Sequence, residues 1–235
     1  MTAVQPAVLF GPVAVRILLG EVAARFRNET GEAVELRLDL NPAVAERIRG
    51  GEAYDLGITN PEHAAPLFAD GLAAPESHRP LGAAPLAVAR RSGTGGEVAR
   101  EAAALADLLR GAASVGYTAP GTSGKTFLAA LARLGMEGAS DPRFRPMGGG
   151  EPAAATAAGE TELAVAPLTT VLSYPGLELA GVFPEAVVPA IRMSMFLAPG
   201  AADARPAAAR LQDFLADPAL DPWLEARGLH RFALD

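Results

Sequence analysis

The first 70 or so residues alternate between two hydrophobic periods, and this alternation restricts the possible folds more than any other feature. Runs at residues 8–10, 33–40 and 54–58 have the short apolar or alternating pattern of β-strands. Each run is followed by a segment whose apolar residues are spaced three and four apart, as on one face of a helix. Strands and helices in this order are typical of an open, mainly parallel sheet flanked by helices. We therefore predict an α/β fold.

The remainder of the chain continues in the same manner. We expect further strands at residues 85–90, 113–117, 162–166 and 187–197. We expect further helices at residues 98–110, 127–134 and 151–159, and two more in the last 30 residues. With 235 residues, half of them apolar, the chain is long enough for one large domain or two smaller ones.

Composition excludes several classes of function. A net charge of −7 provides no electrostatic basis for binding nucleic acid or an anionic membrane surface. The chain has no cysteine, so disulfides, thiolate catalysis and cysteine-ligated metals are excluded. No apolar run approaches the roughly 20 residues that span a bilayer, and we expect no membrane insertion. The three histidines lack the spacing of a metal site or catalytic triad, and we expect no cofactor.

One turn, at residues 117–126, is rich in glycine and hydroxyl side chains and joins a predicted strand to a predicted helix. Backbone N–H groups and the positive end of the helix dipole make such a turn suitable for an anion. Thr118, Thr122, Ser123 and Gly124 are the candidate ligand contacts. Two interpretations remain open for Thr122 and Ser123, because these residue types also cap helices. Lys125, the only lysine in the chain, is either a ligand contact or a solvated residue.

Residues 119–126 also fit a relaxed Walker A pattern, with alanine at the position usually held by glycine. Nucleotide hydrolysis additionally needs an acidic residue after a second apolar strand to hold Mg²⁺. Neither the run at residues 162–166 nor the run at 187–197 ends in an acid. A P-loop nucleotide binder is therefore our second alternative.

From end to end, the sequence resembles bacterial solute-binding proteins of ABC transporters that are related to the molybdate-binding component. The segments that carry the resemblance follow the order and spacing of that family: 8–16, 21–31, 45–58, 148–150, 159–163 and 213–218. The resemblance implies the type II periplasmic-binding-protein fold, in which two α/β lobes close about a hinge on a ligand held in the cleft between them. Lobe one would comprise residues 1–83 plus 195–235, and lobe two residues 84–194.

In oxyanion binders of this family, serine hydroxyls in the first two loops hold the anion. Ala14 and Asn41 stand at the matching positions here, and Gly11-Pro12-Val13 offers no hydroxyl. The resemblance therefore implies a small organic anion or polar organic ligand rather than a tetrahedral oxyanion. The complete set of candidate ligand-binding residues is Pro12, Val13, Ala14, Asn41, Thr59, Asn60, Thr118, Thr122, Ser123, Gly124 and Arg192.

Besides Thr122 and Ser123, two further members of this set have explanations that involve no ligand. Asn41 precedes Pro42, a pair typical of a helix cap followed by the first helical residue. Arg192 lies in an apolar run, and a buried arginine needs a partner, which could be a carboxylate ligand or Asp39.

We expect a binding protein without catalytic residues, acting as a monomer with a small-molecule ligand and an ABC permease as partners. The alternative is an isomerase of small polycarboxylates on the same fold, because such a reaction needs only one base, for which Asp39 is the candidate. If Met1 is the native start, we expect the protein in the cytoplasm. If a leader has been removed, we expect it in the periplasm.

Overall fold

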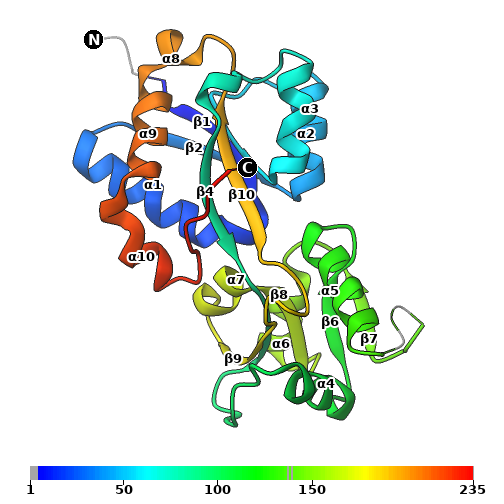
Figure 1. The fold of residues 1–235 in the computed structure, drawn as a ribbon. Coiled ribbons are helices and arrows are strands. Elements are labelled where there is room, and N and C mark those ends of the chain that lie inside the picture. Colours follow the sequence, from blue (N-terminus) through cyan, green and yellow to red (C-terminus); the bar gives the residue numbers. More distant parts are fainter. Residues whose placement is uncertain (1–4, 137, 139, 235) are drawn as a thin grey trace. The chain divides into compact units, whose positions relative to one another are not determined.

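The computed structural model describes residues 5–136, 138 and 140–234. It divides into two compact units (Figure 1). The first unit contains the described residues up to Ala83, then Arg192–Ala226, and the described residues from His230 onward. The second unit contains Ala84–Ile191 and Arg227–Leu229. Each unit has its own sheet and its own hydrophobic core.

The sheet of the first unit has the strand order β2-β1-β3-β10-β4. β1 pairs in parallel with β2 and β3, whereas β10 is antiparallel to β3. The carboxyl ends of β1, β2 and β3 therefore meet the start of β10 at one edge of the sheet, which we call the first strand-end edge. The bounds of these strands are β1 (Ala7–Pro12), β2 (Val34–Asp39), β3 (Leu56–Thr59), β4 (Arg79–Ala84) and β10 (Ile191–Leu197).

Helices cover both faces of this sheet (Figure 1). α2 (Asn41–Arg49) and α3 (Pro61–Ala69) lie on one face, where Phe10 and Phe196 join their apolar residues in one buried cluster. α1 (Arg16–Thr30) and α9 (Pro206–Ala216) lie on the other face. The remaining helices of the unit are short: α8 (Ala201–Ala204), α10 (Asp221–Glu225), and the 3₁₀ turns η1 (Val13–Val15), η2 (Pro75–Ser77) and η3 (Pro218–Leu220).

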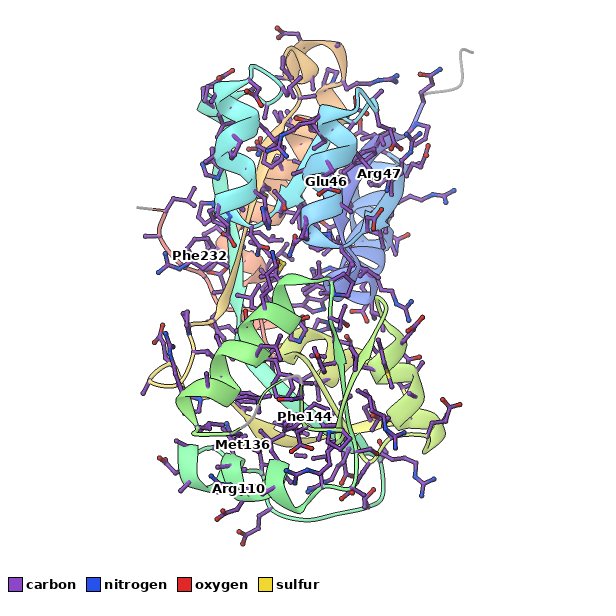
Figure 2. The ribbon with its side chains drawn as sticks, turned by 90° about the vertical axis from the view of Figure 1, so that its right-hand side faces the viewer. Glu46, Arg47, Arg110, Met136, Phe144 and Phe232 are labelled. Carbon is purple, nitrogen blue, oxygen red and sulfur yellow. The ribbon has the colours of Figure 1, made fainter. Side chains whose placement is uncertain are left out.

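An ion-pair group lies over the buried Phe10 ring. Arg47, which lies on α2 and is labelled in Figure 2, has its guanidinium carbon 4.8 Å from the centre of this ring. The same guanidinium contacts the carboxylates of Glu52 at 2.6 Å and Asp39 at 3.5 Å. The hydrogen bond from Arg47 is the main cause of a lowered pKa at Glu52. The group thus covers apolar surface while its charges remain paired.

The sheet of the second unit has the strand order β7-β6-β8-β5-β9. β6 is parallel to β7 and β8, and β5 is antiparallel to β8 and β9. The carboxyl ends of β6, β7 and β8 therefore share an edge, which we call the second strand-end edge. The bounds are β5 (Leu86–Arg91), β6 (Val115–Thr118), β7 (Phe144–Met147), β8 (Leu163–Pro167) and β9 (Leu177–Val182).

Helices also flank both faces of the second sheet. α4 (Ala102–Gly111) and α5 (Thr122–Arg133) contribute to the larger core, in which the rings of Phe127 and Phe144 meet edge to face at 5.5 Å. α6 (Glu151–Ala158) and α7 (Leu168–Ser173) contact β5 and β8 and complete the unit. No helix among the described residues is both long and apolar enough to cross a bilayer.

The α/β prediction is confirmed, and the predicted central strands and long helices are present within a few residues of their expected bounds. The prediction of a strand from Val187 onward is wrong for its first four residues. Val187 lies in a turn, where its N–H donates to the carbonyl of Pro184 at 2.9 Å, and β10 begins only at Ile191. Strands β4, β7 and β9 and helix α7 were not predicted.

Candidate functional site

All seven candidate residues of the first unit lie at the first strand-end edge, because each follows or ends one of the parallel strands or begins β10. They are Pro12 at the end of β1, Val13 and Ala14 in η1, Asn41 at the start of α2, Thr59 at the end of β3, Asn60 before α3, and Arg192 near the start of β10. In open α/β sheets, ligands bind beyond the carboxyl ends of the strands. The topology therefore brings together residues that are up to 180 positions apart in sequence.

Asn41 is held by a hydrogen bond from the neighbouring strand. The Thr59 hydroxyl, which is fully buried, donates to the Asn41 backbone carbonyl at 3.2 Å and to its side-chain oxygen at 3.3 Å. The expectation that Asn41 caps α2 is wrong, because Leu40 occupies the N-cap position and provides no capping side chain. Among the described residues, no acceptor lies within hydrogen-bond distance of Asn41 Nδ2. The amide therefore offers a donor at this edge.

The other amide at this edge has a structural partner. Asn60 is the N-cap residue of α3, but its side chain does not cap the helix. Its Nδ2 instead donates to the Arg192 carbonyl at 2.6 Å, which ties the end of β3 to the start of β10. The Asn60 amide nitrogen is thus already used within the protein.

The prediction that Arg192 is buried is wrong. Its side chain is exposed, and its guanidinium lies 5.4 Å from the ring centre of Phe232, which is labelled in Figure 2. Asp39, the suggested internal partner, instead forms an ion pair with Arg47 at 3.5 Å. The apolar neighbours of Arg192 in β10 suggested a buried side chain. Ile191 and Met193 are indeed buried, but Arg192 between them is exposed.

Ser194 is a polar residue at this edge that sequence reasoning missed. It pairs with Thr59 in the antiparallel register of β10 and β3, and it is fully buried. Its hydroxyl has no hydrogen-bond partner among the described residues. The only sequence signal was a serine between two methionines in an otherwise apolar run.

The second strand-end edge carries the remaining candidates, Thr118, Thr122, Ser123 and Gly124. The predicted strand–turn–helix is present, with β6 ending at Thr118 and α5 beginning at Thr122. Gly121 occupies the N-cap position of α5 and has no side chain with which to cap it. The positive end of α5 therefore lies at the carboxyl end of a parallel strand, a position that favours an anion.

Gly124 is required by packing. A Cβ atom at this position would lie 2.1 Å from the backbone carbonyl oxygen of Thr118. Only glycine lets the first turn of α5 approach the end of β6 this closely. Packing alone therefore explains Gly124, with or without a ligand.

The loop after β7 borders the same edge and was not among the predicted site residues. Thr118 Oγ1 contacts the Gly148 carbonyl at 3.5 Å, and Gly148 N–H donates to the Glu151 carboxylate at 2.6 Å. Gly150, with a φ of 81°, forms the N-cap of α6. The three consecutive glycines before a predicted helix were the sequence signal for a second helix start at this edge.

A separate cavity of about 350 Å³ lies on the second unit between α4 and the end of α5. None of the candidate residues lines it. Its charged lining residues are Asp107, Arg110 and Arg133, of which Arg110 is labelled in Figure 2. Arg133 donates to the Val187 carbonyl, and Arg110 contacts Asp107 at 3.3 Å. These arginines therefore have partners within the protein.

Comparison with known proteins agrees with this architecture. The periplasmic molybdate-binding protein of Azotobacter vinelandii is 18% identical, with a TM-score of 0.79 over 97% of this chain and 99% of that one. The substrate-binding domain of a putative molybdenum ABC transporter from Clostridium difficile is 13% identical, with a TM-score of 0.72 over 97% and 99%. The sulfate-binding protein of Mycobacterium tuberculosis is 14% identical, with a TM-score of 0.71 over 96% and 86%.

These similarities confirm the two-lobed periplasmic-binding-protein fold. No curated protein matches the sequence significantly. The model of one family, described as bacterial extracellular solute-binding protein, matches residues 8–230, nearly the whole chain. This chain therefore belongs to the bacterial extracellular solute-binding protein family.

Proposed function

We propose that the protein captures a small anionic or polar organic ligand between its two units, that closure about a hinge traps this ligand, and that an ABC permease receives it. The family supports the general activity, because its members bind solutes. The identity of the ligand, the closure and the permease are parts of the proposal.

The observation that carries the proposal is the gathering of helix starts at the strand-end edges. α2 and α3 begin at the first edge, and α5 and α6 begin at the second. In none of these four helices does the N-cap side chain cap the helix. Helix N-termini carry positive partial charge and unpaired N–H groups, so each is a favourable position for a negatively charged ligand group.

The side chains at these edges favour an organic acid. The first edge offers the Asn41 amide donor in the place where the related oxyanion binders have a serine hydroxyl, and Pro12, Val13 and Ala14 add no side-chain donor. The second edge offers the hydroxyls of Thr118 and Ser123. The helix starts suit either kind of anion. The small number of hydroxyl donors favours a carboxylate over a tetrahedral oxyanion that must be surrounded by donors.

A thermal-shift screen tests this proposal with four anions, namely succinate, citrate, molybdate and sulfate, and with ATP plus Mg²⁺. A ligand at 100 times its Kd adds about 2.7 kcal/mol to the free energy of unfolding, which is a shift of several degrees for a chain of this size. We expect a carboxylate to raise the Tm and ATP with Mg²⁺ to leave it unchanged. A shift with ATP and Mg²⁺ alone would favour the nucleotide-binding alternative.

The fate of the bound ligand separates binding from catalysis. After prolonged incubation with the protein, the carboxylate should be recovered unchanged, as judged by its proton NMR spectrum. Appearance of an isomer would contradict a pure binding role and favour the isomerase alternative, which requires a base such as Asp39.

A further inference from the structure

Ser194 has the most unusual environment among the buried polar residues of the first unit. Its side chain is fully buried, yet its hydroxyl has no hydrogen-bond partner among the described residues. Buried hydroxyls are almost always hydrogen-bonded, because a buried polar group without a partner destabilises the fold. A serine in such a position needs an explanation beyond packing.

The strand register places Ser194 beside Thr59, which is the hydrogen-bond partner of Asn41. Ser194 is directly opposite Thr59 in the antiparallel pair, so the two side chains lie on the same face of the sheet. That face is the one covered by α2 and α3, because Phe196, two residues further along β10, belongs to the same cluster as Val44 of α2 and Leu67 of α3. Thr59 in turn donates its hydroxyl proton to Asn41.

Ser194, Thr59 and Asn41 are therefore consecutive neighbours across this face of the sheet: Ser194 is paired with Thr59, and Thr59 is hydrogen-bonded to Asn41. Thr59 shares its single proton between two acceptors of Asn41, at 3.2 and 3.3 Å, and its oxygen retains lone pairs that can accept a further hydrogen bond. When the Asn41 amide donates to an anion, its side-chain oxygen becomes a better acceptor. The Thr59 hydroxyl then bonds this oxygen more strongly and itself becomes a better acceptor.

We propose that Ser194 is a positioning residue of the ligand site, whose hydroxyl donates to Thr59 Oγ1 when an anion is bound at Asn41. The hydroxyl then gains in the bound state the partner that it lacks in the structure described here. This inference rests on the proposed function, and it specifies that the ligand presents an acceptor, such as a carboxylate, to the first unit. Because Thr59 holds the Asn41 side-chain oxygen, the amide turns its donor toward the ligand.

Ser194→Ala tests the inference, with Ser77→Ala as the matched control. Ser77 is a second buried serine of the first unit that also contacts β10, but its hydroxyl accepts from Leu197 N at 2.8 Å and donates to the Ala74 carbonyl at 2.6 Å.

The measurements are the Tm of the free protein and the Kd of succinate, citrate, molybdate and sulfate by calorimetry. We expect S194A to raise the Tm and to weaken the tightest of these anions about tenfold. We expect S77A to lower the Tm and to leave that Kd unchanged.

A double variant checks that Ser194 acts through Thr59. If it does, Thr59→Val removes the effect of S194A, so that the double variant binds the anion no more weakly than T59V alone. Unchanged affinity in S194A would overturn the inference, whatever its Tm. Independent, additive losses in the double variant would overturn the proposed route through Thr59. If the wild-type protein binds none of the four anions, the proposal that its ligand is an anion fails, and the inference about Ser194 fails with it.

Discussion

At the residue scale, the first strand-end edge depends on how short polar side chains are held. Thr59 fixes the Asn41 side-chain oxygen, and Asn60 uses its amide nitrogen to hold the carbonyl of Arg192. Two asparagines that look equivalent in the sequence thus have different roles in the structure. Asn41 presents a donor, whereas Asn60 links two strands.

His78 provides a pH-dependent contribution at the same scale. Its Nε2 is buried without a partner among the described residues, and its ring lies 4.6 Å from that of Phe68. Burial lowers the pKa of His78 below its ordinary value. Between the lowered pKa and the ordinary value of about 6.5, the unfolded chain binds more protons than the folded one, so stability falls as the pH is lowered through this range.

The variant His78→Phe removes this effect while keeping an aromatic ring against Phe68. We expect the Tm of the wild-type protein to decrease from pH 7.5 to pH 5.5 more than the Tm of H78F does, because phenylalanine does not bind a proton. Scanning calorimetry at several pH values measures both decreases. Identical decreases would show that the His78 ring is solvated and is protonated freely in the folded state.

Sequence could predict which residues gather at the edges, but not their hydrogen bonds. The candidates Thr59 and Asn60 follow from a strand pattern that ends where a helix begins, and the structure places them there. The partner of the Asn60 side chain lies on β10, 132 positions away, and depends on a strand pairing that no local pattern specifies. The partner of Thr59 lies at the start of α2, and its contact depends on how this helix packs on the sheet. For the same reason, the buried Ser194 could not be distinguished from an ordinary strand residue.

At the element scale, the strands that were not predicted share one property. β4, β7 and β9 are each an outermost strand of their sheet, with a neighbouring strand on one side only. β4 and β7 contain proline, which cannot donate to a central ladder, and all three have partly exposed residues that weaken the hydrophobic pattern. The central strands β3, β5 and β8 are buried nearly throughout and are evident as apolar runs. Burial on both faces, rather than strand length, made these strands predictable.

The junction of β6 and α5 provides a test at this scale. Gly124→Ala places a methyl group 2.1 Å from the Thr118 carbonyl oxygen. Because this oxygen belongs to the backbone of β6, the clash is relieved only if α5 and β6 move apart. We expect a loss of about 2–3 kcal/mol in the free energy of unfolding, in the upper part of the usual range for overpacking. Chemical denaturation measures the loss.

Gly20→Ala is the matched control for this variant. Gly20 lies in α1, is exposed, and has no atom within 4 Å of an added Cβ. Alanine is the better helix former, so G20A should be about 0.5–1 kcal/mol more stable than the wild-type protein. Equal stability of G124A and the wild-type protein would contradict the close contact between α5 and β6.

At the scale of the whole molecule, the chain leaves the first unit at Ala83 and returns to it at Arg192. β4 and β10, the strands in which these crossings lie, are also the strands that complete the first sheet beside β3. The proposed hinge therefore lies at the ends of two strands whose other residues are fixed by a sheet. Asn60, through its bond to the Arg192 carbonyl, connects the first strand-end edge directly to one of these crossings.

Small-angle X-ray scattering of the full chain, with and without saturating succinate, citrate, molybdate or sulfate, tests the central claim most directly. Capture by closure predicts that at least one of these anions lowers the radius of gyration, because a ligand that is bound by both units stabilises the closed form. A radius of gyration that stays the same with every anion would contradict capture of an anion between the two units.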